Sequence, residues 1–260
     1  MSYTFPFGQQ ISVVQQRDRT PKKVFVLGVY ASAVHACWRG NDKKIKVKAL
    51  AVASEPYIFW KGDGVQEIIN KISMPKELGY LEPALPMFNG PSGIALDELF
   101  LRPLRISRKE AWLCDLLPFS RLNPNQKKAL AKFYEPEVIR YDLPRCSIPY
   151  FTKKELKLQS NRHIEILEEI EESQCDTIIL LGDLPVKYWL AYFSKFRKLS
   201  DFGDNQNDYG NPRNIKLNKK DYVIIPLVHP RQAVNLGKTS KKWNELHSKW
   251  VTNQVESQYK

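Results

Sequence analysis

Four short apolar runs constrain the fold of this chain more than any other feature of the sequence. They occupy residues 23–28, 111–117, 176–182 and 222–228, and helical segments of mixed polarity lie between them. A nearly continuous apolar run is typical of a strand that is covered on both faces, and such strands form parallel sheets. We therefore expect an α/β fold, a three-layer α/β/α sandwich with a central, mostly parallel sheet.

The length of the chain is sufficient for one large domain. With 260 residues, 43% of them hydrophobic, the chain can bury a substantial core. We expect residues 1–22 to form an N-terminal extension packed on that core and residues 23–255 to form a single domain. An exposed loop or hairpin is expected near residues 200–220, where the sequence is polar, basic and rich in asparagine and glycine.

Charge and cysteine usage narrow the classes of partner and cofactor. The formal net charge of +12 favours polyanions, of which nucleic acid is the commonest, although solvated surface lysines give the same composition. The four cysteines are widely spaced with no CxxC pair, so we expect no metal site, no redox pair and no cofactor. Since no apolar run approaches about 20 residues and no signal-peptide pattern opens the chain, we expect a monomeric, cytoplasmic protein with no membrane contact.

The segments that follow the first run leave one alternative open. Residues 29–38 contain several small side chains and are predicted to be a tight crossing from strand to helix. Backbone N–H groups at the start of that helix would form an anion site, and close packing alone is the other interpretation. Residues 43–53 alternate lysines with apolar residues and predict a second strand, whereas residues 74–86 are predicted to be a proline-rich loop.

The central stretch of the chain, residues 88–124, carries the candidate site. It is predicted to contain a glycine-rich loop, a helix from residue 92 to about residue 102 and the buried strand 111–117. Open α/β sheets bind ligands at the carboxyl ends of their strands. An aromatic ring, Phe88, and a carboxyl group, Asp115, delivered to that edge are candidates for stacking on and reading a planar ring. The alternatives are that Phe88 is ordinary core and that Asp115 caps a helix or pairs with a basic residue.

Four motifs in sequence order give the chain a resemblance to a known family. They are the aromatic-glycine loop Phe88-Asn89-Gly90-Pro91-Ser92-Gly93, the segment Leu96-Asp97-Glu98-Leu99, the strand end Leu181-Gly182 and the pair His229-Pro230. Over roughly residues 23–251 the chain resembles the uracil-DNA glycosylase superfamily, and its motif layout is most similar to that of the thermostable iron–sulfur uracil-DNA glycosylases. The resemblance implies an α/β/α sandwich that flips a base out of DNA into a pocket. The cysteine spacing of the iron–sulfur members is missing, so no cluster is expected.

The resemblance also implies roles for individual residues. Phe88 would stack under the flipped base, Asp115 stands where the family has a base-reading asparagine, and His229 would stabilise the departing base oxygen. Arg231 lies in the loop that enters the duplex. The other positions expected to contact the base or the DNA are Asn89, Gly28, Lys238, Lys241 and Asn123, with lysines at residues 43–48, 216–220 and 238–242 binding phosphates.

Two departures from the family pattern bear on activity. The turn at residues 28–32 lacks the acid or amide that positions the attacking water in most members, which leaves Tyr30, Ser32 and His35 to orient it. Asp115 replaces asparagine, and an ionised carboxylate only accepts hydrogen bonds. It cannot bond to uracil O4, which is also an acceptor, but it can accept from the amino groups of guanine or cytosine. A buried Asp115 with a raised pKa would instead be protonated and mimic the amide.

We therefore expect a DNA glycosylase that hydrolyses the N-glycosidic bond of a flipped damaged or unusual base, uracil or another deaminated base, in single- or double-stranded DNA. His229, Tyr30 and Ser32 are the candidate catalytic residues. Two alternatives stay open: a non-catalytic DNA-binding or damage-sensing module of the same fold, and a hydrolase of free nucleosides or nucleotides. Steep salt dependence of polynucleotide binding would favour the glycosylase and the binding module over the hydrolase of free nucleosides or nucleotides.

Overall fold

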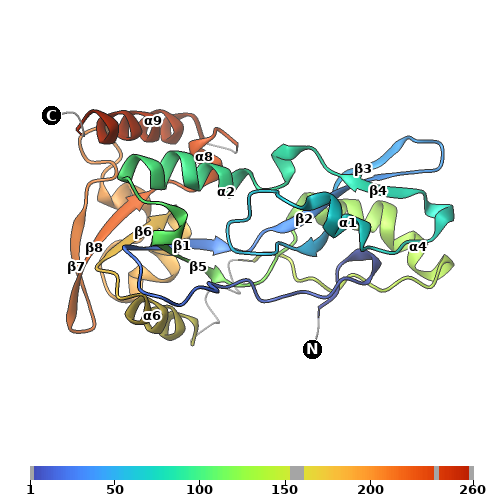
Figure 1. Ribbon diagram of the computed structural model, residues 1–260, viewed down its shortest axis with the longest axis horizontal. Helices are drawn as coiled ribbons and strands as arrows, with labels where there is room; N and C mark the ends of the chain where they lie inside the picture. Colours follow the sequence, from blue (N-terminus) through green and yellow to red (C-terminus); the bar gives the residue numbers. More distant parts are fainter. Residues whose placement is uncertain (1–2, 153–160, 237–239, 258–260) are drawn as a thin grey trace. The chain divides into compact units, whose positions relative to one another are not determined.

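The computed structural model describes residues 3–152, 161–236 and 240–257 of the chain (Figure 1). Contacts between residues divide them into two compact units. Unit 1 contains residues 3–14, 30–91 and 117–152, and unit 2 contains residues 15–29, 92–116, 161–236 and 240–257. Because the chain passes back and forth between the units, neither is a consecutive segment, and the single domain expected over residues 23–255 stays a prediction.

A five-stranded sheet forms the centre of unit 2. Its strands stand in the order β5 (Ala111–Leu117), β1 (Val24–Tyr30), β6 (Thr177–Leu181), β8 (Lys220–Leu227) and β7 (Arg213–Leu217). β6 pairs in parallel with both β1 and β8, whereas β7 pairs with β8 in antiparallel fashion. The prediction of an α/β fold with a mostly parallel central sheet is confirmed.

Hydrogen bonds at both ends of β1 indicate that β5 runs in the same direction. Just before the two strands begin, the amide of Lys23 donates to the carbonyl of Glu110 over 2.8 Å. At their other ends, the amide of Ala31 donates to the carbonyl of Leu117 over 3.1 Å. The strands β5, β1, β6 and β8 therefore all end at the same edge of the sheet.

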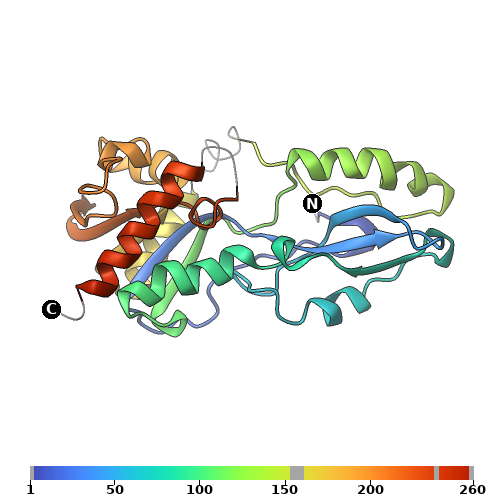
Figure 2. The same ribbon diagram turned by 90° about the horizontal axis from the view of Figure 1, so that it is seen from above.

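Helices cover both faces of this sheet, which explains why β1, β5, β6 and most of β8 are largely apolar. In Figure 1, α6 (Arg162–Ser173) lies on one side, and α9 (Ser240–Glu256) lies on the other beside the helical segment that starts with α2 (Pro91–Ala95). Figure 2 shows α9 and that segment next to each other from above. The segment continues through the π-helix η4 (Leu96–Leu101) and the 3-10 turns η5 (Arg102–Leu104) and η6 (Arg108–Glu110), which confirms the helix predicted from residue 92.

Shorter elements connect the strands of unit 2. They are α7 (Asp183–Tyr188), η8 (Leu190–Tyr192), η9 (Leu199–Phe202) and α8 (Pro230–Ala233). Strands β7 and β8 form a hairpin, as was one of the expectations for the region near residues 200–220. In the sequence, Thr152 followed by Glu155 predicts the start of a charged helix that runs to about Ser173. The part from Arg162 is confirmed by α6, and residues 153–160 lie outside the described residues. Among the helices of the described part of the chain, none has the length and apolar character that a membrane crossing requires.

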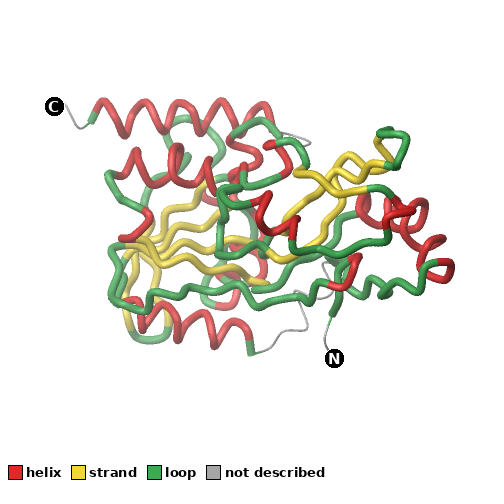
Figure 3. Tube along the Cα trace, turned by 45° about the vertical axis from the view of Figure 1, so that its right-hand side comes forward, coloured by secondary structure: helices red, strands yellow, loops and turns green. Residues whose placement is uncertain are grey.

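Unit 1 contains a second, antiparallel sheet, in which the central strand β2 (Ala33–Arg39) lies between β3 (Ile45–Ser54) and β4 (Tyr80–Pro83) (Figure 3). β3 confirms the strand predicted over residues 43–53. The strand-to-helix crossing predicted over residues 29–38 is wrong, and so is the anion site at the start of that helix. Residues 33–39 instead form β2, which pairs in antiparallel fashion with both β3 and β4. β4 occupies part of the predicted loop 74–86.

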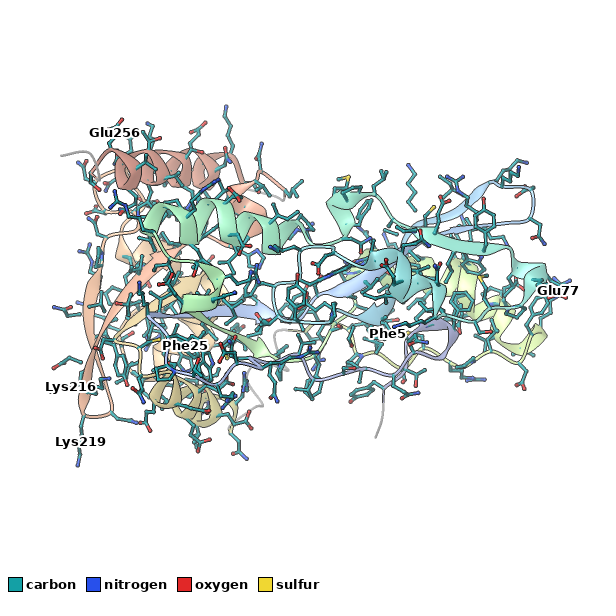
Figure 4. The ribbon with its side chains drawn as sticks, in the orientation of Figure 1. Phe5, Phe25, Glu77, Lys216, Lys219 and Glu256 are labelled. Carbon is teal, nitrogen blue, oxygen red and sulfur yellow. The ribbon has the colours of Figure 1, made fainter. Side chains whose placement is uncertain are left out.

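The start of the chain packs into the core of unit 1. Phe5, labelled in Figure 4, is fully buried, and the ring of Phe7 in η1 (Pro6–Gly8) contacts Trp38 and Tyr134 edge-on, at centroid distances of 5.5 Å and 5.0 Å. The expected extension of residues 1–22 is thus divided between the two units. The remaining helices and turns of unit 1 are α1 (Val65–Asn70), η2 (Lys76–Leu78), η3 (Pro86–Phe88), α3 (Pro124–Ala129), the π-helix η7 (Leu130–Tyr134) and α4 (Glu135–Arg140).

Candidate functional site

The carboxyl edge of the unit 2 sheet is the candidate functional site. From β1 the chain goes first to β5 on one side and later to β6 on the other, so the order of the strands reverses between β1 and β6. Open α/β sheets bind ligands outside the carboxyl ends of their strands at such a reversal. Two predicted site residues flank it. Asp115 lies in β5, which neighbours β1, and His229 follows β8, which neighbours β6.

His229 is held in a defined protonation state by its own loop. It is the N-cap of α8, and its Nδ1 accepts the backbone N–H of Arg231 over 3.2 Å. Burial, and then the charge of Arg231, lowers the pKa of His229 to about 4, so the imidazole is neutral at pH 7. A neutral imidazole whose Nδ1 accepts must carry its proton on Nε2. His229 therefore offers one N–H donor from Nε2.

Gly182, which follows β6, lies close to His229 and has backbone angles that favour glycine. Its amide donates to the carbonyl of Leu227 over 2.7 Å, and an added Cβ would lie 3.2 Å from the Cβ of His229. Its backbone angles, φ 88° and ψ −173°, belong to a region that is essentially restricted to glycine. This glycine therefore lets the loops after β6 and β8 lie against each other.

Asp115 is a carboxyl group in an apolar setting. The residue is 3% exposed, and the pKa of its side chain is raised to about 7, chiefly by burial and also by the charge of the neighbouring Glu169. The charge of Arg162 and a hydrogen bond from the backbone of Val29 act in the opposite direction. The bond to Val29 turns the carboxyl toward the end of β1, where the strand order reverses.

Arg162 anchors α6 to the strand that carries Asp115. Its guanidinium donates to the backbone carbonyl of Asp115 over 2.7 Å and to the thiol of Cys114 over 3.1 Å. It also pairs with Glu169 over 3.1 Å, and Glu169 in turn accepts the indole N–H of Trp112 over 3.0 Å. The buried carboxylate of Glu169 thus has two partners, and the position of Asp115 is fixed through its backbone.

The first part of the aromatic-glycine loop, residues 88–91, belongs to unit 1, where Asn89 binds β2. Phe88 closes η3 and is half-buried. The amide side chain of Asn89 accepts the N–H of His35 over 2.8 Å and donates to the carbonyls of His35 and Ala84 over 2.9 Å and 3.3 Å. Gly90 lies so near Lys61 that an added Cβ would be 2.1 Å from its carbonyl carbon. Asn89 and Gly90 therefore fix the backbone around Phe88, and contact of Phe88 or Asn89 with a base stays a prediction.

Tyr30 at the end of β1 and Ser32 in the turn that follows, both in unit 1, are two of the three residues proposed to orient water. The ring of Tyr30 stacks on Phe151 at a centroid distance of 5.0 Å. The N–H of Ser32 donates to the carboxylate of Glu55 over 3.0 Å, and its carbonyl accepts the hydroxyl of Ser120. Glu55 is only 4% exposed. Glu55 was not among the predicted site residues, because the resemblance places the acid within residues 28–32. The position of Glu55 directly after β3 was the available signal.

The other predicted contacts are distributed over both units. Gly28 is buried within β1, and Arg231 and Lys241 of unit 2 are exposed. Asn123 caps α3 in unit 1, accepting the amides of Asn125 and Gln126. Lys238 lies outside the described residues. No group of three or more histidine, cysteine or acidic side chains that could hold a metal ion occurs in the described ranges.

Comparisons with known proteins do not assign the chain to a family. No protein-family model matches the chain, and no curated protein sequence matches it. The function is therefore proposed from the site itself.

Proposed function

We propose that this protein is a DNA glycosylase, a monomeric cytoplasmic enzyme that hydrolyses the N-glycosidic bond of a flipped, damaged or unusual base in DNA. The observation that carries the proposal is the state of His229. A neutral imidazole with its proton on Nε2 stands beside the strand-order reversal of the unit 2 sheet. The motif resemblance, with His229 at the position of the family's leaving-group histidine, is the second support.

A neutral donor suits this reaction. When the bond between the sugar C1′ and the base nitrogen breaks, the electron pair leaves with the base, and negative charge builds on the base carbonyl oxygen. An N–H that points at this oxygen stabilises the charge as it develops, and removing one such donor costs about 10²–10³ in kcat in comparable sites. The cationic sugar then bonds to the oxygen of a water molecule, and the water's proton is taken up by the released base.

Asp115 fits the recognition of a keto base in its protonated form. Because its pKa is about 7, roughly half of the molecules carry the proton at neutral pH. A protonated carboxyl has one donor and one acceptor, the pattern that complements the O4 and N3–H of uracil. β5 and β8 are three strand spacings apart, about 14 Å between backbones, which a six-membered ring with a side chain on each side can span. A deaminated base such as uracil is therefore the favoured substrate.

The charge of the chain supports DNA as the carrier of that base. The formal net charge is +12, and the hairpin of unit 2 carries exposed lysines, of which Lys216 and Lys219 are labelled in Figure 4. Lys241 adds an exposed cation on α9. Such residues bind phosphates without regard to sequence, so binding should weaken steeply as salt is added.

One observation favours a second candidate, a DNA-binding module without catalysis. The contacts of Tyr30 and Ser32, the candidate water-orienting residues, are those of structural residues. A protein of this kind would flip or bind a damaged base and release it intact.

A cleavage assay tests both candidates. Oligonucleotides with uracil, hypoxanthine, xanthine, mismatched thymine or normal bases, single- and double-stranded, are incubated with the protein and assayed for abasic sites. His163→Ala is the matched control for His229→Ala, because His163 lies on α6, stacks on Tyr192 and has no role in the proposed reaction. We expect cleavage that falls about 10²–10³-fold in His229→Ala and is unchanged in His163→Ala. Salt-sensitive binding without product supports the second candidate, and absence of DNA binding contradicts both.

A further inference from the structure

A buried chain of hydrogen bonds ends on the residue that precedes His229. The amide of Val228 donates to the hydroxyl of Tyr209 over 3.0 Å. The same hydroxyl lies 2.8 Å from Nδ1 of His247, and Nε2 of His247 lies 3.0 Å from the carbonyl oxygen of Leu99. Three segments far apart in the sequence, η4, the loop before β7 and α9, thus meet at the end of β8.

The direction of each bond in this chain follows from its last member. The carbonyl of Leu99 can only accept, so Nε2 of His247 carries a proton. Burial lowers the pKa of His247 to about 4, so the ring is neutral and its Nδ1 is an acceptor. The hydroxyl of Tyr209 must therefore donate to Nδ1, which leaves its oxygen free to accept the N–H of Val228. Every donor in the chain has an acceptor, and consecutive bonds of this kind polarise one another.

The surroundings of the chain hold it rigidly. Tyr209 is 3% exposed and His247 is 1% exposed. The imidazole of His247 lies between two aromatic rings, with centroid distances of 4.2 Å to Phe100 and 5.3 Å to Trp250. Gly210 passes so close to Trp250 that an added Cβ would lie 2.5 Å from its Cδ1. Buried polar groups in such a packed site have few alternative partners, so losing one bond leaves the others unmet.

The position of His229 is therefore determined from two sides. On one side, Gly182 lies against the Cβ of His229 and binds the carbonyl of Leu227. On the other, Tyr209 holds the N–H of Val228. The backbone from Leu227 to His229 is thereby fixed at consecutive residues.

We propose that Tyr209 and His247 are positioning residues that fix the end of β8 and thereby set the direction in which His229 presents its Nε2–H. Neither residue contacts the substrate in this scheme. The catalytic consequence rests on the proposed function, whereas the effect on the backbone and ring of His229 does not.

The test compares two substitutions that each remove one tyrosine hydroxyl. Tyr209→Phe interrupts the chain of hydrogen bonds. Tyr222→Phe is the matched control, because Tyr222 is buried near the opposite end of β8. Hydrogen exchange reports the Val228 amide, and ¹⁵N NMR reports the tautomer of His229. In Tyr209→Phe we expect about tenfold faster exchange at Val228, the equivalent of one lost hydrogen bond, and a mixture of His229 tautomers. On a uracil oligonucleotide, kcat should fall about 10²-fold with KM unchanged.

A second variant guards against the loss of folding in Tyr209→Phe. His247→Phe keeps an aromatic ring at this position and leaves the Tyr209 oxygen able to accept from Val228, so its effects should lie between those of the two tyrosine variants. Wild-type exchange at Val228 and a single His229 tautomer in Tyr209→Phe would overturn the proposal. If the wild type cleaves no substrate, the proposed function fails, and the exchange and NMR measurements still decide whether the positioning chain exists.

Discussion

Replacing Asp115 with asparagine should stabilise the protein, by an amount that depends on pH in a defined way. The side chain of Asp115 is buried, and its pKa is about 7 in the folded protein against an ordinary value of 3.8. The folded state therefore prefers the protonated, neutral carboxyl. Asparagine has the same shape and is neutral at every pH, so Asp115→Asn removes the titration while keeping the packing.

The sign and size of the effect follow from proton linkage. Below pH 3.8 both the folded and the unfolded state carry the proton, and Asp115 contributes no pH dependence. Between pH 3.8 and about 7 the unfolded state has lost the proton and the folded state has kept it, so the stability of the wild type falls as the pH rises. The pKa difference of about 3 units corresponds to about 4 kcal/mol, which is fully lost above pH 7.

Urea denaturation between pH 4 and pH 9 measures this directly. The difference in the free energy of unfolding between Asp115→Asn and the wild type should be small at pH 4, grow through pH 7 and then stay constant at a few kcal/mol. Taking the difference between the two proteins cancels every other titrating group, including the buried histidines. Asp221→Asn is the control, because Asp221 is exposed in β8 and should show no such rise. A difference that is flat with pH, or one that favours the wild type above pH 7, would refute the reasoning.

Two further substitutions test the packing at the carboxyl edge. Gly182→Ala should lower the free energy of unfolding by about 1–3 kcal/mol, because the backbone angles suit only glycine. It should also displace His229, so the activation free energy of any glycosylase reaction should rise by more than the stability falls. Arg162→Met should cost about 3–5 kcal/mol in thermal or urea unfolding, because it leaves the carboxylate of Glu169 buried without its charged partner. Adding Glu169→Gln to Arg162→Met should recover much of that loss, and no recovery would mean that the pair is not the cause.

The strands of the unit 2 sheet were predictable because each one is visible in the local sequence as a short apolar run. A strand with helices on both faces needs apolar side chains at most positions, and β1, β5, β6 and the second half of β8 follow that rule, with Asp115 as the exception in β5. The order of the strands was not predictable in the same way. It depends on which helices cover which face, and it is this order that places Asp115 and His229 on either side of the reversal.

The sheet of unit 1 could not be predicted because its central strand has no strong local signal. Residues 29–38 are small and apolar, a composition that also suits a helix start, and β2 is stabilised by partners from residues 45–54 and 80–83. The hydrogen bonds of Tyr209 and His247 could not be predicted for a related reason. Tyr209 lies in a polar stretch that was predicted to be exposed, and His247 lies in a basic segment, yet both are buried by contacts across long sequence separations.

The course of the chain after β1 also changes how the missing acid of residues 28–32 is interpreted. Because β2 begins at Ala33, the turn between the two strands is too short to contain a helix start, and its amides need partners from elsewhere. One partner is Glu55, whose buried carboxylate accepts the N–H of Ser32 from the end of β3. An acid therefore stands at this turn although the local sequence has none. The absence of an acid from residues 28–32 is for this reason no measure of whether the protein can position a water molecule, and only the cleavage assay separates an enzyme from a binding module.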